Sequence, residues 1–440
     1  MKLCQGFVFK LKTNSKIEKK FSLYASHNRF VWNKALALIK ERLLQREIDK
    51  TVAMHLYRFI DLTRFPPYEE MANMLTFWKK SNEYSFLKEA PSQTLQQTLK
   101  DLYNAIYASF NPDNGIEFPK FKKKGKSPDS FRYPQGFKIK DNKVFLPKIG
   151  WVKFYKSREI TGKPKNITVK RYADGWYISI ITEQKAEKPK INKTNPIGID
   201  VGVRKTITLS NGYYFSMPNT TKIEKKIIKL ERQLNRKQHP RKKGDTTLFS
   251  NNYRKHQKKL SKAYLKLSRI RKDFLHKAST AIAKNHDIVM VEDLKIRNMT
   301  KSAKGTIDNP GHNVKAKSKL NKKILGQSWG LFFSMLNYKL SRKGGRLIKV
   351  NPAQTSQACP VCGQISKLNR KSQAVFKCVA CGYENNADLV AAFNILQKGK
   401  ENPNQTLPQG LREVTPVEYG KVHTLKQEPL SQTERGILFL

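Results

Sequence analysis

Four cysteines in the last quarter of the chain form two Cys-x-x-Cys pairs. The pattern C-x2-C-x15-C-x2-C comprises Cys359, Cys362, Cys378 and Cys381. Each tight turn offers two thiolates to one tetrahedral ion, and Gly363 and Gly382 follow the pairs where the chain must turn sharply. Because all four ligands are sulfur, the pattern predicts one structural Zn²⁺ without an open position for catalysis. The ordinary alternative is four inert buried thiols.

Carboxylates at the ends of predicted elements form a second candidate group. Asp200 follows the apolar strand start IGI, Glu292 and Asp293 follow the apolar run IVMV, and Asp388 opens an apolar helix. Each has an ordinary explanation, since Asp200 suits a strand end and Asp388 suits the positive end of a helix dipole. Strand alternation puts Glu292 and Asp293 on opposite faces and leaves open which of them faces a site.

Together these acids predict more than each does alone. Three carboxylates on two strands and a helix can converge at one end of a sheet. Hard oxygen ligands there would hold two Mg²⁺ or Mn²⁺ ions about 4 Å apart, the arrangement used for phosphodiester hydrolysis. A strand followed by Asp-x-Gly also occurs in sugar-kinase-like folds, but those predict a second Gly-rich phosphate loop and give no reason for a strongly basic chain.

The first 190 residues predict helices inserted into a β domain. Residues 5–12 alternate as a strand, whose apolar face comprises Phe7, Phe9 and Leu11. Helical spacing follows from about residue 28 to 110, with Ser92 as a candidate cap. The spaced residues are Trp32, Leu36, Ile39, Leu43, Leu95, Leu99, Leu102, Ile106 and Phe110. A basic loop, FPKFKKKGK at 118–126, precedes further strands with a turn signal at Asp174-Gly175.

A Lys- and Pro-rich linker at 185–196 leads into a second unit. Three adjacent strands are expected from IGIDVGV, KTITLS and YYFSMP, followed by two long basic helices that could pack as a hairpin. The apolar strand DIVMVEDL at 287–294 comes next. A later helix ends at Gly344-Gly345, and RLIKV then leads into the cysteine region. Beyond about residue 400 the sequence loses periodicity and predicts a flexible tail.

The charge indicates a polyanionic partner. The 440 residues include 86 Lys and Arg against 34 Asp and Glu, a formal charge of +52, and 38% are hydrophobic, enough for real cores. A compact DNA reader makes roughly 6 to 10 phosphate contacts, whereas an RNA–DNA heteroduplex of about 20 base pairs offers about 40 phosphates. The excess of positive charge in this chain matches the number of phosphates in a heteroduplex better than the number that a compact DNA reader contacts. Individual lysines on the long helices are still expected to be solvated.

Other classes of protein are disfavoured. No apolar run near 18 residues and no basic amphipathic anchor are present, so no membrane attachment is expected. The start, MKLCQGFVFKLK, lacks the apolar region of a secretory signal. Four paired cysteines and a lone Cys4 favour metal binding in a reducing compartment, so an intracellular protein is expected.

Several motifs carry a resemblance to a known family. IGIDVGVRKTITLSNG, IVMVEDLKIRNM, GGRLIKVNPAQTSQACPVCG and FKCVACGYENNADLVAAFNIL are similar to the successive RuvC-like and zinc-ribbon motifs of TnpB, the transposon-encoded relatives of type V CRISPR effectors. RFVWNKAL, PSQTLQQTLKDL and FPKFKKKGK match as well, so the likeness spans the chain to about residue 398.

The resemblance implies a multidomain α+β fold: a wedge β-barrel with an inserted helical recognition domain, then an RNase-H-like (RuvC) α/β domain with an inserted Cys4 zinc ribbon. The implied boundaries are 1–18 and 116–190 for the barrel, 19–115 for the helical insert, 191–351 and 386–400 for the RuvC-like domain, 352–385 for the zinc ribbon, which binds target nucleic acid, and 401–440 for the tail. The polar stretch 298–321 is then either a gate over the nuclease site or plain disorder.

The resemblance also implies roles. Asp200 matches the first catalytic aspartate, Glu292 rather than Asp293 the glutamate, and Asp388 the last aspartate, together binding two Mg²⁺ or Mn²⁺ ions. Val390 departs from the asparagine that many relatives carry there, which puts a contact behind the metal ligands in doubt.

The implied activity is RNA-guided DNA endonuclease, with a short adjacent DNA motif read by the protein. The implied partners are guide RNA, target double-stranded DNA and the RNA–DNA heteroduplex, with one chain per guide, in the cytoplasm and nucleoid of a prokaryotic cell. The alternatives are a non-cutting RNA-guided repressor and an RNase-H-fold transposase that also joins strands. The aromatic and basic residues of FPKFKKKGKSPDSFRY either stack on unpaired bases or belong to the β-domain core.

Overall fold

The computed structural model describes residues 2–56, 68–112, 115–185, 195–240, 246–401 and 423–424. The chain divides into two compact units after residue 186. Within the described residues, no helix combines the length and apolar character needed to cross a membrane. The predicted linker at 185–196 lies almost entirely outside these residues, as does the predicted tail at 401–440 apart from Glu401 and a two-residue strand.

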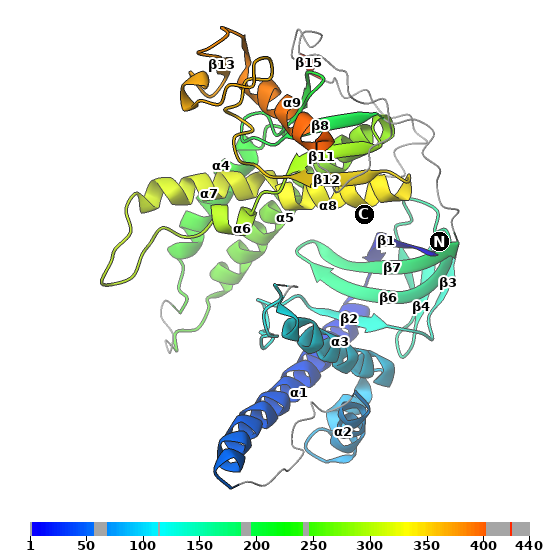
Figure 1. Cartoon of the computed structure of the whole chain (residues 1–440). Coiled ribbons are helices and arrows are strands. Elements are labelled where there is room, and N and C mark those ends of the chain that lie inside the picture. The colour runs from blue at the N-terminus through cyan, green and yellow to red at the C-terminus, as the bar shows by residue number, and fades with distance from the viewer. Residues whose placement is uncertain are drawn as a thin grey trace. The chain divides into compact units, whose positions relative to one another are not determined.

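The first unit is an antiparallel sheet with helices (Figure 1). Its strands are β1 (Lys2–Lys12), β2 (Ser130–Tyr133), β3 (Lys138–Lys140), β4 (Lys143–Leu146), β5 (Gly150–Phe154), β6 (Lys163–Tyr172) and β7 (Gly175–Lys185). They are ordered β2-β6-β7-β1-β5-β4-β3. Its helices are α1 (Ser15–Leu56), α2 (Tyr68–Lys80), the 3-10 turn η1 (Ser85–Glu89) and α3 (Ser92–Phe110). The helices therefore fall in sequence between the first and second strands of one sheet, and closure into a barrel stays a prediction.

The core of this unit follows the predicted periodicities. Phe7, Phe9 and Leu11 alternate along β1 and are all buried, and Phe9 stacks on Phe154 with ring centroids 5.0 Å apart. The helical set of α3 is buried up to Ile106. Two expectations were wrong: helix α1 begins at Ser15 rather than near 28, and Ser92 is inside α3 rather than its cap, because Pro91 holds the cap position.

The second unit is built on a mixed sheet ordered β12-β11-β8-β9-β10-β15. Its strands are β8 (Pro196–Asp200), β9 (Ile207–Leu209), β10 (Tyr213–Phe215), β11 (Ile288–Glu292), β12 (Arg346–Val350) and β15 (His423–Thr424). Its helices are α4 (Thr221–Asn235), α5 (Asn251–Asn285), α6 (Ile296–Met299), α7 (Val314–Gln327), α8 (Trp329–Arg342) and α9 (Ala387–Lys400). The cysteine region adds η3 (Lys367–Asn369) and the hairpin β13 (Val375–Lys377) and β14 (Glu384–Asn386).

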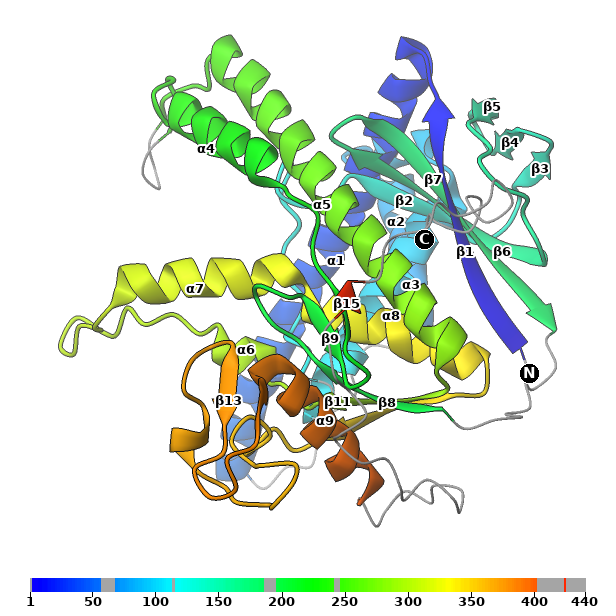
Figure 2. The same ribbon diagram turned by 90° about the horizontal axis from the view of Figure 1, so that it is seen from above.

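Helices cover both faces of the parallel part of this sheet, formed by β8, β11 and β12. Helix α9 lies on one face, and α8 lies on the other (Figure 1). The basic helices α4 and α5 run side by side as the predicted hairpin (Figure 2), with Ile227, Leu230, Ala263 and Leu267 buried between them. The polar stretch 298–321 is partly helical, since α7 begins at Val314, and the Asn321 side chain donates to the Thr300 carbonyl at 3.0 Å.

Candidate functional site

Alternation along β8 determines which face Asp200 occupies. Ile197 and Ile199 are buried in the core shared with α5 and α8. Gly198, between them, faces α9, where an added Cβ would lie 2.1 Å from the Ala392 carbonyl oxygen. Because successive strand residues point to opposite faces, Asp200 follows Gly198 and ends β8 on the α9 side of the sheet.

The same argument places Glu292. Val289 and Val291 belong to the α5 and α8 core, whereas Ile288 and Met290 pack on the face covered by α9. Glu292 continues the second series and ends β11. Both acids are therefore at the carboxyl ends of neighbouring parallel strands. On one side of β8 the sheet continues with β11 and β12, and on the other side with β9 and β10. In open α/β sheets, ligands usually bind at the carboxyl ends of the strands where the strand order reverses in this way.

Asp388 comes to the same place from α9. The cap of this helix is Asn386, whose side-chain oxygen accepts from the N–H groups of Asp388 and Leu389 at 3.2 and 3.4 Å. Asn386 is therefore the cap, and Asp388 lies in the first turn of α9, where its charge also suits the helix dipole. Asp388 lines a cleft together with Ala391 from the next turn.

One cleft of about 420 Å³ contains all three acids. Its lining residues are Asp200, Val201, Gly202, Val203, Arg204, Lys205, Glu292, Pro352, Thr355, Ser356, Arg370, Gln373, Ala374, Asn386, Asp388 and Ala391. The structure thus brings together three residues that are far apart in the sequence and come from two strands and one helix.

Burial is the main cause of the raised pKa values of two acids in the cleft. Burial, and then the charges of Glu292 and Asp388, raise the pKa of Asp200 to about 7, while Arg370 and the Val201 N–H oppose the rise. Burial also raises the pKa of Glu292, against a hydrogen bond from Thr355 and the charge of Lys398. Partly buried carboxyl groups that repel one another form a site suited to cations.

Asp293 points away from this site. Its carboxylate forms ion pairs with Lys295 at 2.6 Å and Lys349 at 3.2 Å, and these hydrogen bonds lower its pKa. Strand alternation left open which of the two acids faces the site. In the structure Glu292 lines the cleft, and Asp293 lies outside it.

Two residues of the cleft were not expected from the sequence. Arg370 lies between the two cysteine pairs, where nothing in the sequence separates it from the lysines around it. Thr355 is buried and its hydroxyl donates to Glu292 Oε1 at 2.5 Å. No spacing rule relates a threonine in a loop to a glutamate 63 positions earlier.

The cleft residues fit a divalent cation site. Asp200, Glu292 and Asp388 supply the hard carboxylate oxygens that Mg²⁺ and Mn²⁺ prefer. Burial, and then repulsion from Glu292 and Asp388, raises the pKa of Asp200, and a bound cation would oppose both effects. The donor set and its electrostatics therefore agree with the ions that the sequence predicts.

The four cysteines also form a metal-binding group. Their sulfur atoms all lie within 4.8 Å of one another, and Cys359 to Cys381 and Cys362 to Cys378 are each separated by 3.6 Å. Zn–S bonds of about 2.3 Å in a tetrahedron separate sulfurs by about 3.8 Å. The cluster could therefore hold an ion such as Zn²⁺, and Gly363 and Gly382 have the positive φ angles, 75° and 72°, that their turns require.

Val390 has a role in this cluster rather than in the cleft. It is buried with Cys359, Phe376, Cys378 and Ala387 in a small apolar core that joins α9 to the cysteine region. The valine that replaces asparagine at position 390 therefore packs in this apolar core.

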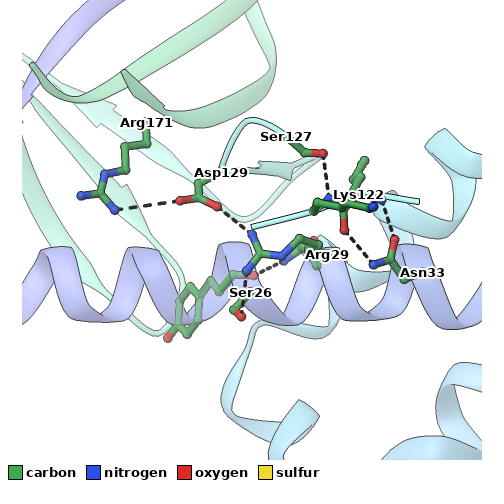
Figure 3. A network of polar contacts seen from close by, with 10 residues as sticks. Ser26, Arg29, Asn33, Lys122, Ser127, Asp129 and Arg171 are labelled. Carbon is green, nitrogen blue, oxygen red and sulfur yellow. Dashed lines mark hydrogen bonds and ion pairs between the residues drawn. The ribbon is translucent and has the colours of Figure 1, made fainter. Parts of the chain in front are cut away.

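The predicted basic loop of the first unit is fixed to α1 (Figure 3). The Asn33 side chain donates to the Lys122 carbonyl at 2.8 Å and accepts from the Lys122 N–H at 2.8 Å. The Lys122 ammonium lies 3.4 Å from the centre of the Trp32 ring, and burial lowers its pKa to about 8. At the end of the loop, Asp129 pairs with Arg29 at 2.7 Å and Arg171 at 3.9 Å.

This attachment leaves one face of the loop exposed. Lys123, Lys124 and Lys126 are all exposed, and a bond from the Lys123 N–H to the Ser127 hydroxyl at 3.0 Å closes the turn (Figure 3). Phe131 and Tyr133 are buried in the core and Phe118 packs against it, as the core alternative predicts, whereas Phe121 is 44% exposed and its stacking on bases stays a prediction.

Three family models match parts of the chain. The "Cas12f1-like, TNB domain" model matches residues 329–395, which run from α8 through the cysteine cluster into α9. The "Probable transposase" model matches residues 179–303, and the "Helix-turn-helix domain" model matches residues 1–47. In this structure the last range forms β1 and most of α1.

Curated relatives and solved structures also match, over either most of the chain or a short part of it. It is 42% identical over 402 residues to "Putative RNA-guided DNA endonuclease InsQ" of Escherichia coli (strain K12), covering 91% of this chain and 93% of that protein. It is 55% identical over 58 residues to "CRISPR-associated endodeoxyribonuclease Cas12f1" of Sulfoacidibacillus thermotolerans, 13% of this chain and 14% of that protein. A cryo-EM structure of a Cas12f1-sgRNA-target DNA complex aligns with 92% of this chain and 100% of that chain, at a TM-score of 0.32 and 18% identity.

Proposed function

Because the chain belongs to the TnpB family of transposon-encoded RNA-guided DNA endonucleases, to which InsQ belongs, we propose that it cuts DNA under the direction of a bound RNA. The observation that carries this proposal is the convergence of Asp200, Glu292 and Asp388 on one cleft. The cleft lies at the carboxyl ends of β8 and β11, and no other acid lines it among the described residues. A cation-dependent hydrolysis of phosphodiesters is the chemistry that such a group supports best.

In this proposal the three carboxylates hold two Mg²⁺ or Mn²⁺ ions. Ions bound there supply an activated water and stabilise the leaving oxygen of the phosphodiester. The contribution of the protein is to hold its acids ionised and in place: Arg370 and the Val201 N–H favour the ionised form of Asp200, and Thr355 and Lys398 favour that of Glu292. Arg370 also provides a fixed positive charge beside a phosphate that enters the cleft.

The partners in this proposal are the guide RNA, the target DNA and the heteroduplex they form. A charge of +52 exceeds what a short DNA site needs. The exposed lysines of the loop at 118–126 are held on a fixed backbone, as a phosphate-contacting surface requires. Sequence is then read by base pairing, and the protein itself reads a short adjacent DNA motif. The four cysteines hold one structural Zn²⁺, and one chain serves each guide.

The test is cleavage by the purified RNA complex. Sequencing the RNA that copurifies with the protein defines the target to place in a DNA substrate. D200A, E292Q and D388A are each expected to abolish Mg²⁺-dependent cutting while leaving the amount of bound RNA unchanged. D293N is the matched control, since Asp293 adjoins Glu292 in sequence but lies outside the cleft and pairs with Lys295 and Lys349, and it is expected to cut normally.

Three results would refute the proposal. Undiminished cutting by D200A or E292Q would remove the cleft from the mechanism. Binding of the target without any cutting by the unmodified complex would favour an RNA-guided repressor, and products in which strands are joined would favour a transposase.

A further inference from the structure

A single hydrogen bond connects the loop before the cysteine cluster to Glu292. The Thr355 hydroxyl lies 2.5 Å from Glu292 Oε1 and 3.0 Å from the Pro352 carbonyl oxygen. A hydroxyl has one proton, and an ionised carboxylate is the stronger acceptor, so the proton belongs on the shorter contact to Glu292. Thr355 is only 2% exposed, so water cannot readily replace it.

Thr355 is itself held from α9. The side-chain amide of Asn394 uses both of its N–H donors on this loop, one to the Thr355 carbonyl and one to the Ala358 carbonyl, each at 2.8 Å. Ala358 directly precedes Cys359, the first ligand of the cysteine cluster. Asn394 is buried, 7% exposed, so both bonds are made away from solvent.

The residues that make these contacts follow one stripe of α9. Asp388 and Ala391 line the cleft, Asn394 follows three residues later, and Lys398 follows after four more, so all lie on one helical face. Lys398 Nζ donates to the Ala353 carbonyl. The helix that presents one acid of the cleft therefore also holds the loop that orients another.

We propose that Thr355 is a positioning residue for the cleavage reaction: its buried hydroxyl fixes the Glu292 carboxylate, and Asn394 fixes Thr355. This inference rests on the proposed function. It assigns a role in the reaction to Thr355, which acts through Glu292 and does not touch the substrate. The bond to Oε1 restricts the orientation in which the Glu292 carboxylate lines the cleft. Groups that hydrogen-bond to metal-binding carboxylates typically change metal affinity by about 10- to 100-fold when removed.

The test compares two substitutions that differ only in the hydroxyl. T355V keeps the shape of the side chain and removes the donor, whereas T355S keeps the donor. Mn²⁺ binding to the purified RNA complex is measured by electron paramagnetic resonance, with the D200A/E292Q/D388A complex as the baseline for ions held by RNA. T355V is expected to bind Mn²⁺ about tenfold more weakly and T355S to remain within about threefold of the unmodified complex.

A cleavage assay adds a second readout. T355V should need about tenfold more Mg²⁺ for half-maximal cutting and recover most of its rate at high Mg²⁺, whereas E292Q should not recover. N394A should show the same shift to a smaller degree, and it provides the test if T355V does not fold.

Three outcomes would overturn or separate the claims. A T355V complex with its zinc and RNA intact but with unmodified Mn²⁺ affinity would overturn the inference, and so would an equal defect in T355S. Mn²⁺ binding is measured without DNA, so it does not depend on cutting. If T355V binds Mn²⁺ more weakly but the unmodified complex never cuts DNA, the proposed nuclease function is refuted and the role of Thr355 in holding Glu292 is supported.

Discussion

Arg370 and Asp200 line the same cleft, and the charge of the arginine lowers the pKa of the aspartate against burial and two neighbouring carboxyls. Arg370 lies between the cysteine pairs, at the end of the 3-10 turn η3, and Asp200 ends the strand β8. The cysteine region therefore contributes a side chain to the cleft in addition to the four sulfurs that could hold an ion.

Replacing Arg370 should impair cutting more than binding. R370A removes a guanidinium that opposes the raised pKa of Asp200 in this cleft, and losing a preorganised charge beside a reacting group costs about 10²- to 10³-fold in rate. The measurement is single-turnover cleavage by the RNA complex, with zinc content determined in parallel. K371A changes the adjacent exposed residue and should cut normally. Equal rates for R370A and K371A would show that Arg370 has no part in the reaction.

Periodicity could predict the strands and helices that carry the site, because each is a strongly patterned element. The apolar run before Glu292, the helix after Asp388 and the alternation in β1 all formed as expected. Alternation alone could not choose between Glu292 and Asp293. That choice depends on which face of β11 α9 covers, and this is a tertiary contact between segments far apart in the sequence.

Other features could not be predicted because they depend on single tertiary contacts. Arg370 resembles any other base in a basic segment until the fold brings it to the cleft. Thr355 becomes significant only through a bond to a residue on another strand. Asn386 did carry a local signal, since asparagine is a preferred N-cap and it directly precedes Ala387 and Asp388 at the start of α9.

The basic loop of the first unit should contribute to RNA affinity through its lysines and through its fixed backbone. K123Q/K124Q/K126Q removes three exposed charges, so the slope of log affinity against log salt should fall by about 2 to 3. N33A keeps every charge but removes both bonds to Lys122, so affinity should fall while the slope stays nearly unchanged. Filter binding of the copurifying RNA at several salt concentrations measures both.

The matched control for the loop is K138Q/K140Q/K143Q. These three lysines are exposed on the β3–β4 hairpin of the same unit. If this triple variant lowers the slope as much as the loop variant does, RNA contacts are spread over the unit and the loop has no special role.

Lys339 of α8 should make stability depend on pH. Its ammonium donates to the His276 carbonyl at 2.8 Å and to the hydroxyls of Ser279 and Thr280 at 2.8 and 2.7 Å. Burial lowers its pKa to about 8, whereas an unfolded lysine has a pKa of about 10.4. Between these values the unfolded chain binds more protons, so the contribution of Lys339 to stability rises with pH.

Chemical denaturation at pH 7.5 and 9.5 checks this expectation. The free energy of unfolding of the unmodified protein, relative to K339M, should increase by about 2 kcal/mol between the two values. K343M, which replaces an exposed lysine just beyond the same helix, should show no such change. If the free energies of unfolding of K339M and the unmodified protein differ by the same amount at both pH values, the pKa of Lys339 is not lowered by burial as stated.

Gly198 should be the position where the site is most sensitive to a single added methyl group. Its missing side chain lets α9 approach β8 closely: a Cβ there would lie 2.1 Å from the Ala392 carbonyl oxygen and 2.7 Å from the Leu396 nitrogen, both main-chain atoms. G198A must therefore move α9 away from the sheet, and overpacking of this kind costs about 1 to 3 kcal/mol or more. Because Asp200 and Asp388 are on the two elements that would separate, cutting should be lost together with stability.

G330A is the matched control, because the nearest atom to a Cβ at Gly330 is Ile296 Cδ1 at 3.7 Å, and alanine favours helix over glycine. Its thermal midpoint should equal or exceed that of the unmodified protein, with normal cutting. Thermal unfolding and cleavage are measured on both variants. A G198A protein with an unchanged midpoint and normal cutting would show that α9 does not pack this closely on β8, and the convergence of the three acids would then lose its structural basis.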